Sequence, residues 1–272
     1  MQQNFFYQPS NLVFFSLSGN DSIDLFNRLS TNNINVDQNG ITQTIFTNEN
    51  GRIIDIVSIW NIDTNNVIFM CNSLNKKFLI DWINKFTFEE EIELNEIADL
   101  RLIHLFNNTP KINFDNFISS NKIINKIEEQ FGYFYSGKTS FYNNHESIDL
   151  ILNKNIEPDI KKLLYSEGFS EFNEKQFLSF RIKNSIPYGV NEINSTFNPL
   201  ELNLIHLIDF EKGCYIGQEV IARLDTYDKV QKKLITLNKK NSENLINSPG
   251  SQITSQNDNN CMIVVKKKFL NI

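Results

Sequence analysis

The 272-residue sequence has no long apolar run, and no stretch approaches the about 18 consecutive apolar residues that a membrane-spanning helix needs. Its first ten residues contain no basic residue and no apolar core. They have neither the form of a secretory signal peptide nor that of an arginine-rich transit peptide. We therefore expect a cytoplasmic protein that does not enter a membrane.

Cysteine is scarce, with three residues, Cys71, Cys214 and Cys261, far apart in the sequence. An odd number of distant cysteines fits reduced thiols better than a disulfide framework. The sequence contains no C-x-x-C, H-E-x-x-H or G-x-G-x-x-G pattern, and its three histidines are scattered. These absences give no support to thioredoxin-type chemistry, metal-dependent hydrolysis or dinucleotide binding.

Positive charge is too low for a dedicated nucleic-acid binder. Lys and Arg together number 26 against 32 Asp and Glu, which gives a formal net charge of −6. Phosphate contacts need concentrated positive charge. The one sizeable basic run, at 266–268, fits the solvated end of a strand. We expect no direct binding to nucleic acid.

One segment, residues 132–139, matches the phosphate-binding pattern G-x-x-x-x-G-K-[ST] letter for letter. Such a loop binds phosphate only when a buried strand precedes it and a helix follows it. Here charged residues precede the segment, turn-like residues follow it, and the bulky Tyr133, Phe134 and Tyr135 would crowd a phosphate. We therefore predict a strand with alternating aromatic residues and no nucleotide site.

What the sequence does contain is a mixture of strand and helix patterns, with 40% hydrophobic residues and 23 phenylalanines to form its cores. Strands are predicted at 11–17, 43–46, 52–62, 66–71, 91–97 and 101–106, and helices at 22–30, 74–86, 158–168 and 174–184. Only strands are predicted after Tyr227, at 229–238, 252–255 and 262–269. This order predicts an α+β protein with a small β unit at the C-terminal end.

The segment Asp209–Arg223 gathers residues that the chain otherwise uses sparingly. It holds Cys214, two of the ten glycines, one of the two alanines and one of the five arginines. Gly213 and Gly217 predict a tight, exposed turn with backbone angles that other residues resist. A helix is predicted from Gln218 onward, with Gly217 as its N-cap.

Cys214 would then lie just before a helix N-terminus and two residues from Lys212. Both positive groups favour the thiolate, which is the nucleophilic and metal-binding form of cysteine. The alternative is an inert cysteine buried in a packed turn. Such cysteines usually lie in apolar runs without flanking glycines and charges, so we favour a reactive thiol.

The residues from Lys212 to Arg223 read K-G-C-Y-x-G-Q-E followed by A-R. They resemble the signature of the YgfZ folate-binding proteins, distant relatives of the glycine-cleavage T-protein, an aminomethyltransferase. Similarity continues in the same order along residues 12–238, in the segments 17–21, 29–31, 50–55, 181–190 and 199–203. The resemblance implies that Cys214 and Lys212 are the catalytic pair and that the rest of the signature forms their loop: Gly213, Tyr215, Gly217, Gln218, Glu219 and Arg223.

The resemblance also implies a T-protein-like multi-domain arrangement, with antiparallel sheets flanked by helices and a short C-terminal β-barrel-like unit. A folate-binding region is expected at residues 1–222, with a ferredoxin-like unit inserted at about 43–130. The small β unit would occupy residues 223–272. Tetrahydrofolate or a derivative would lie in a central opening near Cys214.

By the same resemblance, we expect a folate-binding accessory protein for the assembly or repair of iron–sulfur clusters in client enzymes, which would indirectly support tRNA modification by radical enzymes. Its partners would be those enzymes or assembly proteins, and classical catalysis is not expected. Protein-bound clusters usually take four cysteines, so Cys214 would hold a cluster transiently and share it with a partner.

Two alternatives stay open. One is a tetrahydrofolate-dependent aminomethyltransferase-like enzyme. The stretch at 72–79, where the T-protein has its catalytic Asp, contains no carboxylate, which weakens this alternative. The other is a folate-binding scaffold without chemistry, in which Cys214 only packs.

Four residues are expected to contact folate: Phe177, Arg181, Glu201 and Leu12. A pterin stacks on aromatic or apolar faces, and the glutamate tail of folate needs a cation. Phe177 and Arg181 lie at i and i+4 of one predicted helix, so they project to the same side. Glu201 would accept hydrogen bonds from the pterin. The alternative is that Phe177 belongs to the core and that Arg181 pairs with a surface carboxylate.

Overall fold

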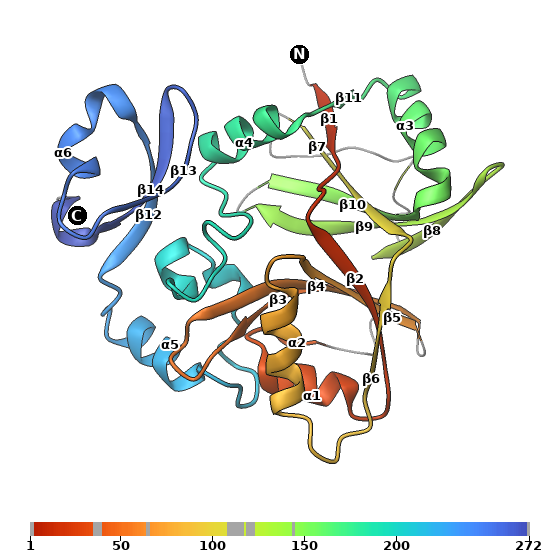
Figure 1. The fold of residues 1–272 in the computed structure, drawn as a ribbon, viewed down its shortest axis with the longest axis horizontal. Helices are drawn as coiled ribbons and strands as arrows, with labels where there is room; N and C mark the ends of the chain where they lie inside the picture. The colour runs from red at the N-terminus through yellow and green to blue at the C-terminus, as the bar shows by residue number, and fades with distance from the viewer. Residues whose placement is uncertain are drawn as a thin grey trace.

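The computed structural model describes residues 3–34, 40–63, 66–107, 117, 123–142 and 145–270, which form three sheets and the helices that pack against them (Figure 1). Within these ranges, no helix is long and apolar enough to cross a membrane. The predicted α+β class, with antiparallel sheets flanked by helices, is confirmed.

The first sheet has five antiparallel strands in the order β3-β4-β5-β2-β6. Its strands are β2 (Leu12–Ser18), β3 (Ile41–Thr47), β4 (Ile53–Asp63), β5 (Asn66–Asn72) and β6 (Glu93–Ile97). The helices α1 (Ser22–Leu29) and α2 (Lys76–Lys85) bury their apolar sides in one core with this sheet. Phe26 of α1 and Leu79 of α2 are fully buried there, beside Phe69 of β5.

The second sheet has six strands in the order β11-β1-β7-β10-β9-β8, in which only the β1–β11 pair is parallel. Its strands are β1 (Asn4–Tyr7), β7 (Leu100–Asn107), β8 (Ile124–Glu129), β9 (Gly132–Tyr142), β10 (His145–Asn153) and β11 (Ser170–Glu171). The helix α3 (Glu157–Ser166) packs on this sheet through Ile160 and Leu164. The helix α4 (Glu174–Lys183) joins a separate aromatic cluster with Tyr7 and Phe106.

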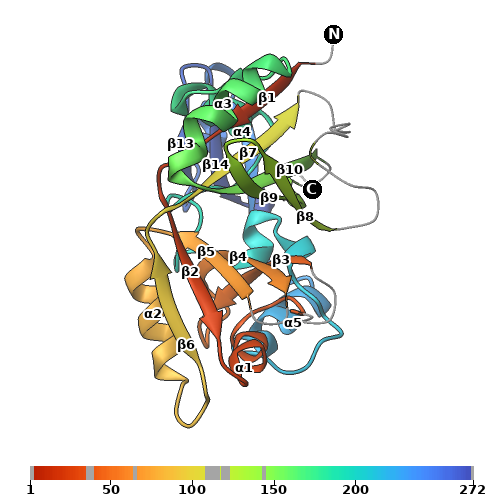
Figure 2. The ribbon, with the colours of Figure 1, turned by 90° about the vertical axis from the view of Figure 1, so that its right-hand side faces the viewer.

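The two large sheets lie one above the other, as Figure 2 shows. Phe14, Trp60 and Met70 from the first sheet share a buried cluster with Leu102 and Ile151 from the second. This apolar layer fixes the two sheets relative to each other, and the cavities described below open where β2, β4 and β5 approach the chain that follows α4.

The C-terminal unit is a three-stranded antiparallel sheet in the order β12-β14-β13, with β12 (Lys232–Asn238), β13 (Gln252–Gln256) and β14 (Asn260–Lys266). The remaining helical segments are η2 (Lys154–Ile156), η3 (Pro199–Leu202), η4 (Ile205–Leu207), α5 (Gln218–Thr226), η5 (Lys239–Asn241), α6 (Glu243–Ile246) and η6 (Lys267–Phe269). Leu234, Met262 and Val264 of this sheet pack on Ile182 and Leu202, so the unit is joined to the main body by an apolar contact.

The structure bears on three further expectations: the strand predicted at 132–139 is confirmed, and two others are refined. The phosphate-loop pattern lies within β9, which pairs with both β8 and β10, so its amides serve the sheet and no phosphate-binding loop is formed. The range 43–130 is divided between two sheets: β3–β6 belong to the first, and β7 and β8 to the second. The C-terminal strands form an open sheet where a barrel-like unit was expected.

Candidate functional site

Cys214 lies in the segment 208–217, which we call the Cys214 loop and which connects η4 to α5. Cys214 is exposed, whereas Cys71 and Cys261 are buried. As predicted, Cys214 is exposed and lies just before a helix that begins at Gln218. The thiol can reach a partner or reagent from solvent without any rearrangement of the core.

Lys212 holds the Cys214 loop on the end of α1. Its ammonium donates to the carbonyl oxygens of Asn27, Ser30 and Asn32, at 2.9, 2.8 and 2.7 Å. An ammonium has three N–H donors, so these three carbonyls use them all. Burial of the ammonium lowers the pKa of Lys212 to about 8. Lys212 therefore anchors the Cys214 loop to residues 27–32, a role that its position in the sequence did not predict.

The main chain of the Cys214 loop adds further ties to the first sheet unit. The amide of Ile216 donates to the carbonyl of Arg28 at 3.1 Å, and the hydroxyl of Thr47 donates to the carbonyl of Ile216 at 2.6 Å. The amide of Asp209 donates to the carbonyl of Thr31 at 3.0 Å. The loop is therefore fixed at both ends, and Cys214 lies between the fixed points.

Gly217 occupies the left-handed conformation, with φ of 89°, and closes the loop against the turn between β3 and β4. A Cβ atom at Gly217 would lie 2.6 Å from the carbonyl oxygen of Asn48 and 3.1 Å from Cα of Gly51. Gly51 is itself left-handed, with φ of 64°. Two glycine-containing segments far apart in the sequence therefore meet backbone to backbone, because neither has a side chain in the way.

Gly213 does not share this constraint, and the expectation that it requires a positive φ is wrong. It is absent from the glycines with positive φ, and a Cβ atom there would have nothing within 4 Å. The tight turn of the Cys214 loop is made at Gly217, while Gly213 lies on the open side.

The remaining signature residues divide between core and surface. Tyr215 is buried with Ile208 and Ile221, and burial raises the pKa of its phenol to about 12. The ammonium of Lys212 lies 5.5 Å from the centre of the Tyr215 ring. Gln218, Glu219 and Arg223 belong to α5. The buried ring of Tyr215 therefore anchors the Cys214 loop to the protein, whereas the neighbouring thiol of Cys214 is exposed.

Two neighbouring cavities border the chain that follows α4, one against the first sheet and the other against α4 and residues 7–11. The Asp55 cavity, about 120 Å³, is lined among others by Leu12, Asp55 and Gln43. The Phe177 cavity, about 390 Å³, is lined among others by Phe177 and Arg181. Both are also lined by the same three residues: Asn72, Tyr188 and Gly189. Of the four residues expected at a folate site, three therefore line one cavity or the other.

Phe177 is 2% exposed and stacks on Tyr7, with 3.8 Å between ring centres and 9° between ring planes. Tyr188 meets Phe177 edge to face at 5.3 Å. Phe177 thus belongs to the aromatic core and also lines the cavity, and its contact with folate stays a prediction.

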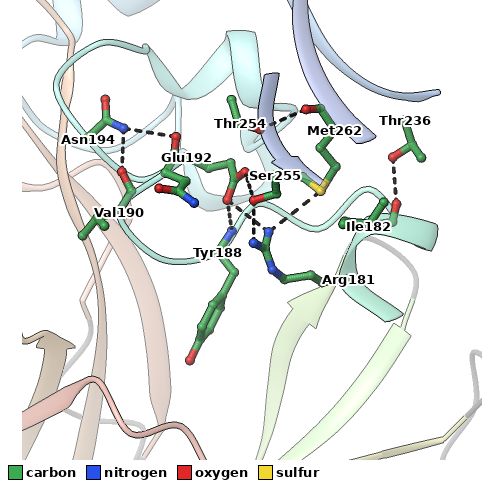
Figure 3. Close-up of polar contacts among 11 residues, drawn as sticks. Arg181, Ile182, Tyr188, Val190, Glu192, Asn194, Thr236, Thr254, Ser255 and Met262 are labelled. Atoms are coloured by element: carbon green, nitrogen blue, oxygen red, sulfur yellow. Dashed lines mark hydrogen bonds and ion pairs between the residues drawn. The ribbon is translucent and has the colours of Figure 1, made fainter. Parts of the chain in front are cut away.

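Arg181 is already paired within the protein (Figure 3). Its guanidinium bonds Glu192 at 3.1 Å and the hydroxyl of Ser255, which in turn donates to Glu192 at 2.7 Å. Glu192 is fully buried, so the carboxylate is an internal one and not the surface one of the alternative interpretation. The contact joins α4 to β13 and uses the charge that was expected to bind a folate tail.

Glu201 lines neither of these two cavities. Its carboxylate accepts from the amide of Asn198 at 3.1 Å and from the guanidinium of Arg52 at 3.2 Å, while Asn198 caps the amide of Glu201. This reciprocal pair is a capping box at the start of η3. The side chain therefore organises the segment beside the cavity and does not face a ligand in it.

Asp55 and Gln43 are cavity residues that sequence reasoning missed. Asp55 is 2% exposed and accepts from the amides of Ile56 and Asn72 and the side chain of Asn75, at 3.0, 2.8 and 3.1 Å. Burial raises the pKa of the Asp55 carboxyl to about 7, against these neutral donors that lower it. Within the described residues, Oε1 of Gln43 is buried and meets no hydrogen-bond donor.

Comparison with known proteins places this architecture among relatives of the T-protein. The model of the GCVT N-terminal domain matches residues 6–104. A tRNA-modifying protein YgfZ of Buchnera aphidicola subsp. Schizaphis graminum is 30% identical over 155 residues, which are 54% of this chain and 46% of that protein. The chain is therefore similar to YgfZ proteins over about half of its length.

Other proteins that are similar to this chain carry different names. A putative chloroplastic transferase of Arabidopsis thaliana, At1g60990, is 27% identical over 78% of this chain and 49% of its own length. A mitochondrial iron–sulfur cluster assembly factor IBA57 homolog of Dictyostelium discoideum is 34% identical over 29% of this chain and 21% of its own length. The chain thus spans about half or less of these curated relatives.

A solved structure extends the likeness to the fold of almost the whole chain. The aminomethyltransferase T of the glycine cleavage system from Bartonella henselae matches 97% of this chain and 78% of its own, with a TM-score of 0.71 at 12% identity. The T-protein-like fold is therefore confirmed.

The described residues offer few ligands for a resident metal cluster. Among the described residues, no group of three or more His, Cys, Asp or Glu side chains is placed to bind a metal ion. Cys214 alone can supply one thiolate, because the other two cysteines are buried elsewhere. A cluster with four cysteine ligands would need ligands from another chain.

Proposed function

We propose that this protein binds a reduced folate and assists the assembly or repair of iron–sulfur clusters in client enzymes through Cys214, and so indirectly supports tRNA modification by radical enzymes. The observation that carries the proposal is the exposed thiol of Cys214 on a loop anchored by Lys212 and Gly217. Similarity to YgfZ proteins and the name of the assembly-factor relative support the same role.

The chemistry of the Cys214 loop suits brief contact with a partner. An exposed thiolate can bind iron or attack a disulfide, and one thiolate cannot complete the four-cysteine set of a common cluster. The fixed loop ends hold the sulfur in one place, so a partner meets a preformed group. We therefore propose client enzymes or assembly proteins as partners, with the cluster shared between the two chains.

The cavities support folate binding in size and character. The Phe177 cavity offers aromatic walls, and the Asp55 cavity offers the acceptors that an amino-substituted heterocycle needs. When bound, a reduced folate would supply a one-carbon carrier or a redox-active pterin beside this unit. The residues of this chain would bind and orient it and exclude water from it.

The test is anaerobic repair of a [4Fe–4S] radical enzyme that has lost its cluster, with iron, sulfide and this protein supplied. We expect wild-type protein to increase the rate at which cluster absorbance returns, and Cys214→Ser to lose that increase while keeping the fold. Cys261→Ala is the matched control, since its thiol is buried in the C-terminal sheet. Equal rates with wild type and Cys214→Ser would overturn the role of Cys214.

A second candidate, tetrahydrofolate-dependent aminomethyl transfer, is favoured by one observation. Asn75, which precedes α2, donates to Asp55, so a carboxylate reaches the start of α2 from β4 although 72–79 contains none. A carboxyl whose pKa is about 7 can take or give a proton near neutral pH. Methylene-tetrahydrofolate formation by wild type, abolished in Asp55→Asn, would establish this activity, and no formation by wild type would exclude it.

The expected location in the cytoplasm stays a prediction. The names of the relatives from Arabidopsis and Dictyostelium place those proteins in the chloroplast and the mitochondrion.

A further inference from the structure

Asp55 and Gln43 present acceptors to the Asp55 cavity, and no lysine or arginine is among the described residues that line it. All three groups that bond the Asp55 carboxylate are neutral donors. A carboxylate offers about four lone-pair sites, so acceptor capacity remains. In the same cavity, Oε1 of Gln43 is buried and finds no donor among the residues that the structure describes. A buried acceptor without a donor is costly unless a ligand supplies one.

The size of the Asp55 cavity limits what can enter. Its volume of about 120 Å³ is close to that of an engineered cavity of about 150 Å³ that holds benzene, so it has room for one six-membered ring. A second ring must continue through the shared wall of Asn72, Tyr188 and Gly189 into the Phe177 cavity. The occupant that fits is flat, has N–H donors on one edge and is longer than one ring.

The Phe177 cavity provides a cation other than Arg181. Arg181 is held by the fully buried Glu192, but Lys175 lines the same cavity and is exposed. The carboxylate of Glu174, beside it, bonds the hydroxyls of Tyr7 and Ser10. An anionic group leaving the aromatic part of the cavity would therefore meet the ammonium of Lys175.

We propose, on the basis of the folate binding proposed above, that Asp55 and Gln43 recognise the amino and amide N–H edge of the pterin ring, and that the aminobenzoyl-glutamate tail crosses the Phe177 cavity to Lys175. In this arrangement the pterin supplies a hydrogen-bond donor to Oε1 of Gln43 and N–H donors to the Asp55 carboxylate. Arg181 keeps its ion pair with Glu192.

A third cavity offers the opposite direction for the tail. It measures about 180 Å³, is lined among others by Asn32, Lys138 and Thr139, and shares Gln43, His206 and Leu207 with the Asp55 cavity. Its lining contains no phenylalanine, tyrosine or tryptophan, whereas the Phe177 cavity has Tyr7, Phe177 and Tyr188. An aminobenzoyl ring is accommodated better between aromatic side chains, which favours the Lys175 side.

The pterin edge is tested with two small ligands, pterin and lumazine, in full-length protein. Lumazine carries an oxo acceptor where pterin carries its 2-amino donor. We expect wild type to bind pterin about tenfold or more tightly than lumazine, because the 2-oxo group of lumazine presents an acceptor where pterin presents its 2-amino donor, so at least one of Asp55 and Gln43 loses its donor. Asp55→Asn and Gln43→Met should each lose most of that preference, a ratio that a general loss of stability does not change. Gln43→Met keeps the test valid if Asp55→Asn fails to fold.

The tail is tested by calorimetry with 5-formyltetrahydrofolate. We expect Lys175→Gln to weaken binding by about two- to fivefold, as for a solvent-exposed ion pair, and to leave pterin binding unchanged. Lys138→Gln is the matched control and should bind as wild type. Weakening by Lys138→Gln in place of Lys175→Gln would overturn the direction of the tail.

The failures can be told apart. If wild type binds pterin and 5-formyltetrahydrofolate but neither Asp55→Asn nor Gln43→Met changes the pterin preference, the assignment of these two residues is overturned and folate binding stands. If wild type binds neither compound, the assignment falls together with the folate part of the proposed function. Repair of clusters through Cys214 is measured separately and does not depend on either result.

Discussion

The Cys214 loop and the wall of the Asp55 cavity differ in how their polar groups are satisfied. In the loop, the three N–H groups of Lys212 meet three carbonyl oxygens of the chain itself. In the cavity wall, Asp55 is buried with neutral donors alone, and Oε1 of Gln43 lacks a donor within the described residues. The loop is complete without a ligand, whereas the cavity has acceptor capacity that a ligand can fill.

Arg181 provides the strongest test of this contrast. It lines a cavity, yet its guanidinium bonds another group of the protein, as the ammonium of Lys212 does. Removing the guanidinium leaves Glu192 buried and unpaired, so Arg181→Met should lower the free energy of unfolding by about 3–5 kcal/mol. Urea denaturation measures the loss. The double variant Arg181→Met with Glu192→Gln should recover part of it, and a single variant as stable as wild type would show that the pair contributes little.

Gly217→Val breaks the closure of the loop. A β-branched residue at φ of 89°, with its Cβ atom 2.6 Å from a carbonyl oxygen, should cost about 3 kcal/mol in the free energy of unfolding. Gly213→Val is the matched control, and we expect it to stay within about 0.5 kcal/mol of wild type, because no atom lies near its side chain. Similar losses in the two variants would contradict the different roles given to these glycines.

Lys212→Met tests whether the loop depends on its ammonium. The methionine keeps an apolar stem but leaves three carbonyls without their donor, so we expect a loss of about 2 kcal/mol and faster hydrogen exchange at Ile216 and Asp209. Lys183→Met, at an exposed position of α4, is the control. Unchanged exchange in Lys212→Met would mean that the main-chain ties hold the loop alone.

The smallest effect concerns pH and the Asp55 carboxyl. Its pKa is higher in the folded protein, about 7, than the ordinary value of 3.8, so the folded state binds the proton more tightly. The stability that this provides is full below pH 3.8 and is lost as the pH rises through about 7. Between pH 6 and 7, wild type should lose on the order of 1 kcal/mol relative to Asp55→Asn, as measured by urea denaturation at each pH. A pH dependence that is the same in both proteins would assign the effect to another group.

The Cys214 loop could be predicted from sequence because its parts are contiguous. The glycine at 217, the helix that begins at Gln218 and the exposed thiol follow from neighbouring residues. The carbonyls that receive Lys212 are about 180 positions away, and nothing local to Lys212 points to them. The sequence therefore predicted an exposed cysteine next to a lysine, but it did not predict which groups the lysine bonds.

The cavity wall was harder to predict because its residues come from separate segments. Glu201 carried a readable signal, since Asn198 three residues before it predicts a capping box. Asp55 carried another, as the single acidic residue among the apolar side chains of 53–57. Arg181 carried none, because its partners lie in the following loop and in β13.

The close approach of Gly51 and Gly217 also limits how this protein can be engineered. The two backbones touch without side chains between them, so the position of the start of α5 depends on the shape of the turn at 48–51. Adding even one residue to that turn would shift the thiol of Cys214 away from its present place, even though no residue near the thiol had changed. Inserted residues should therefore be tolerated in the open turn around Gly168, where a Cβ atom meets nothing within 4 Å, as long as Gly168 itself is kept for its φ of 82°, and they should be rejected at the contact between Gly51 and Gly217.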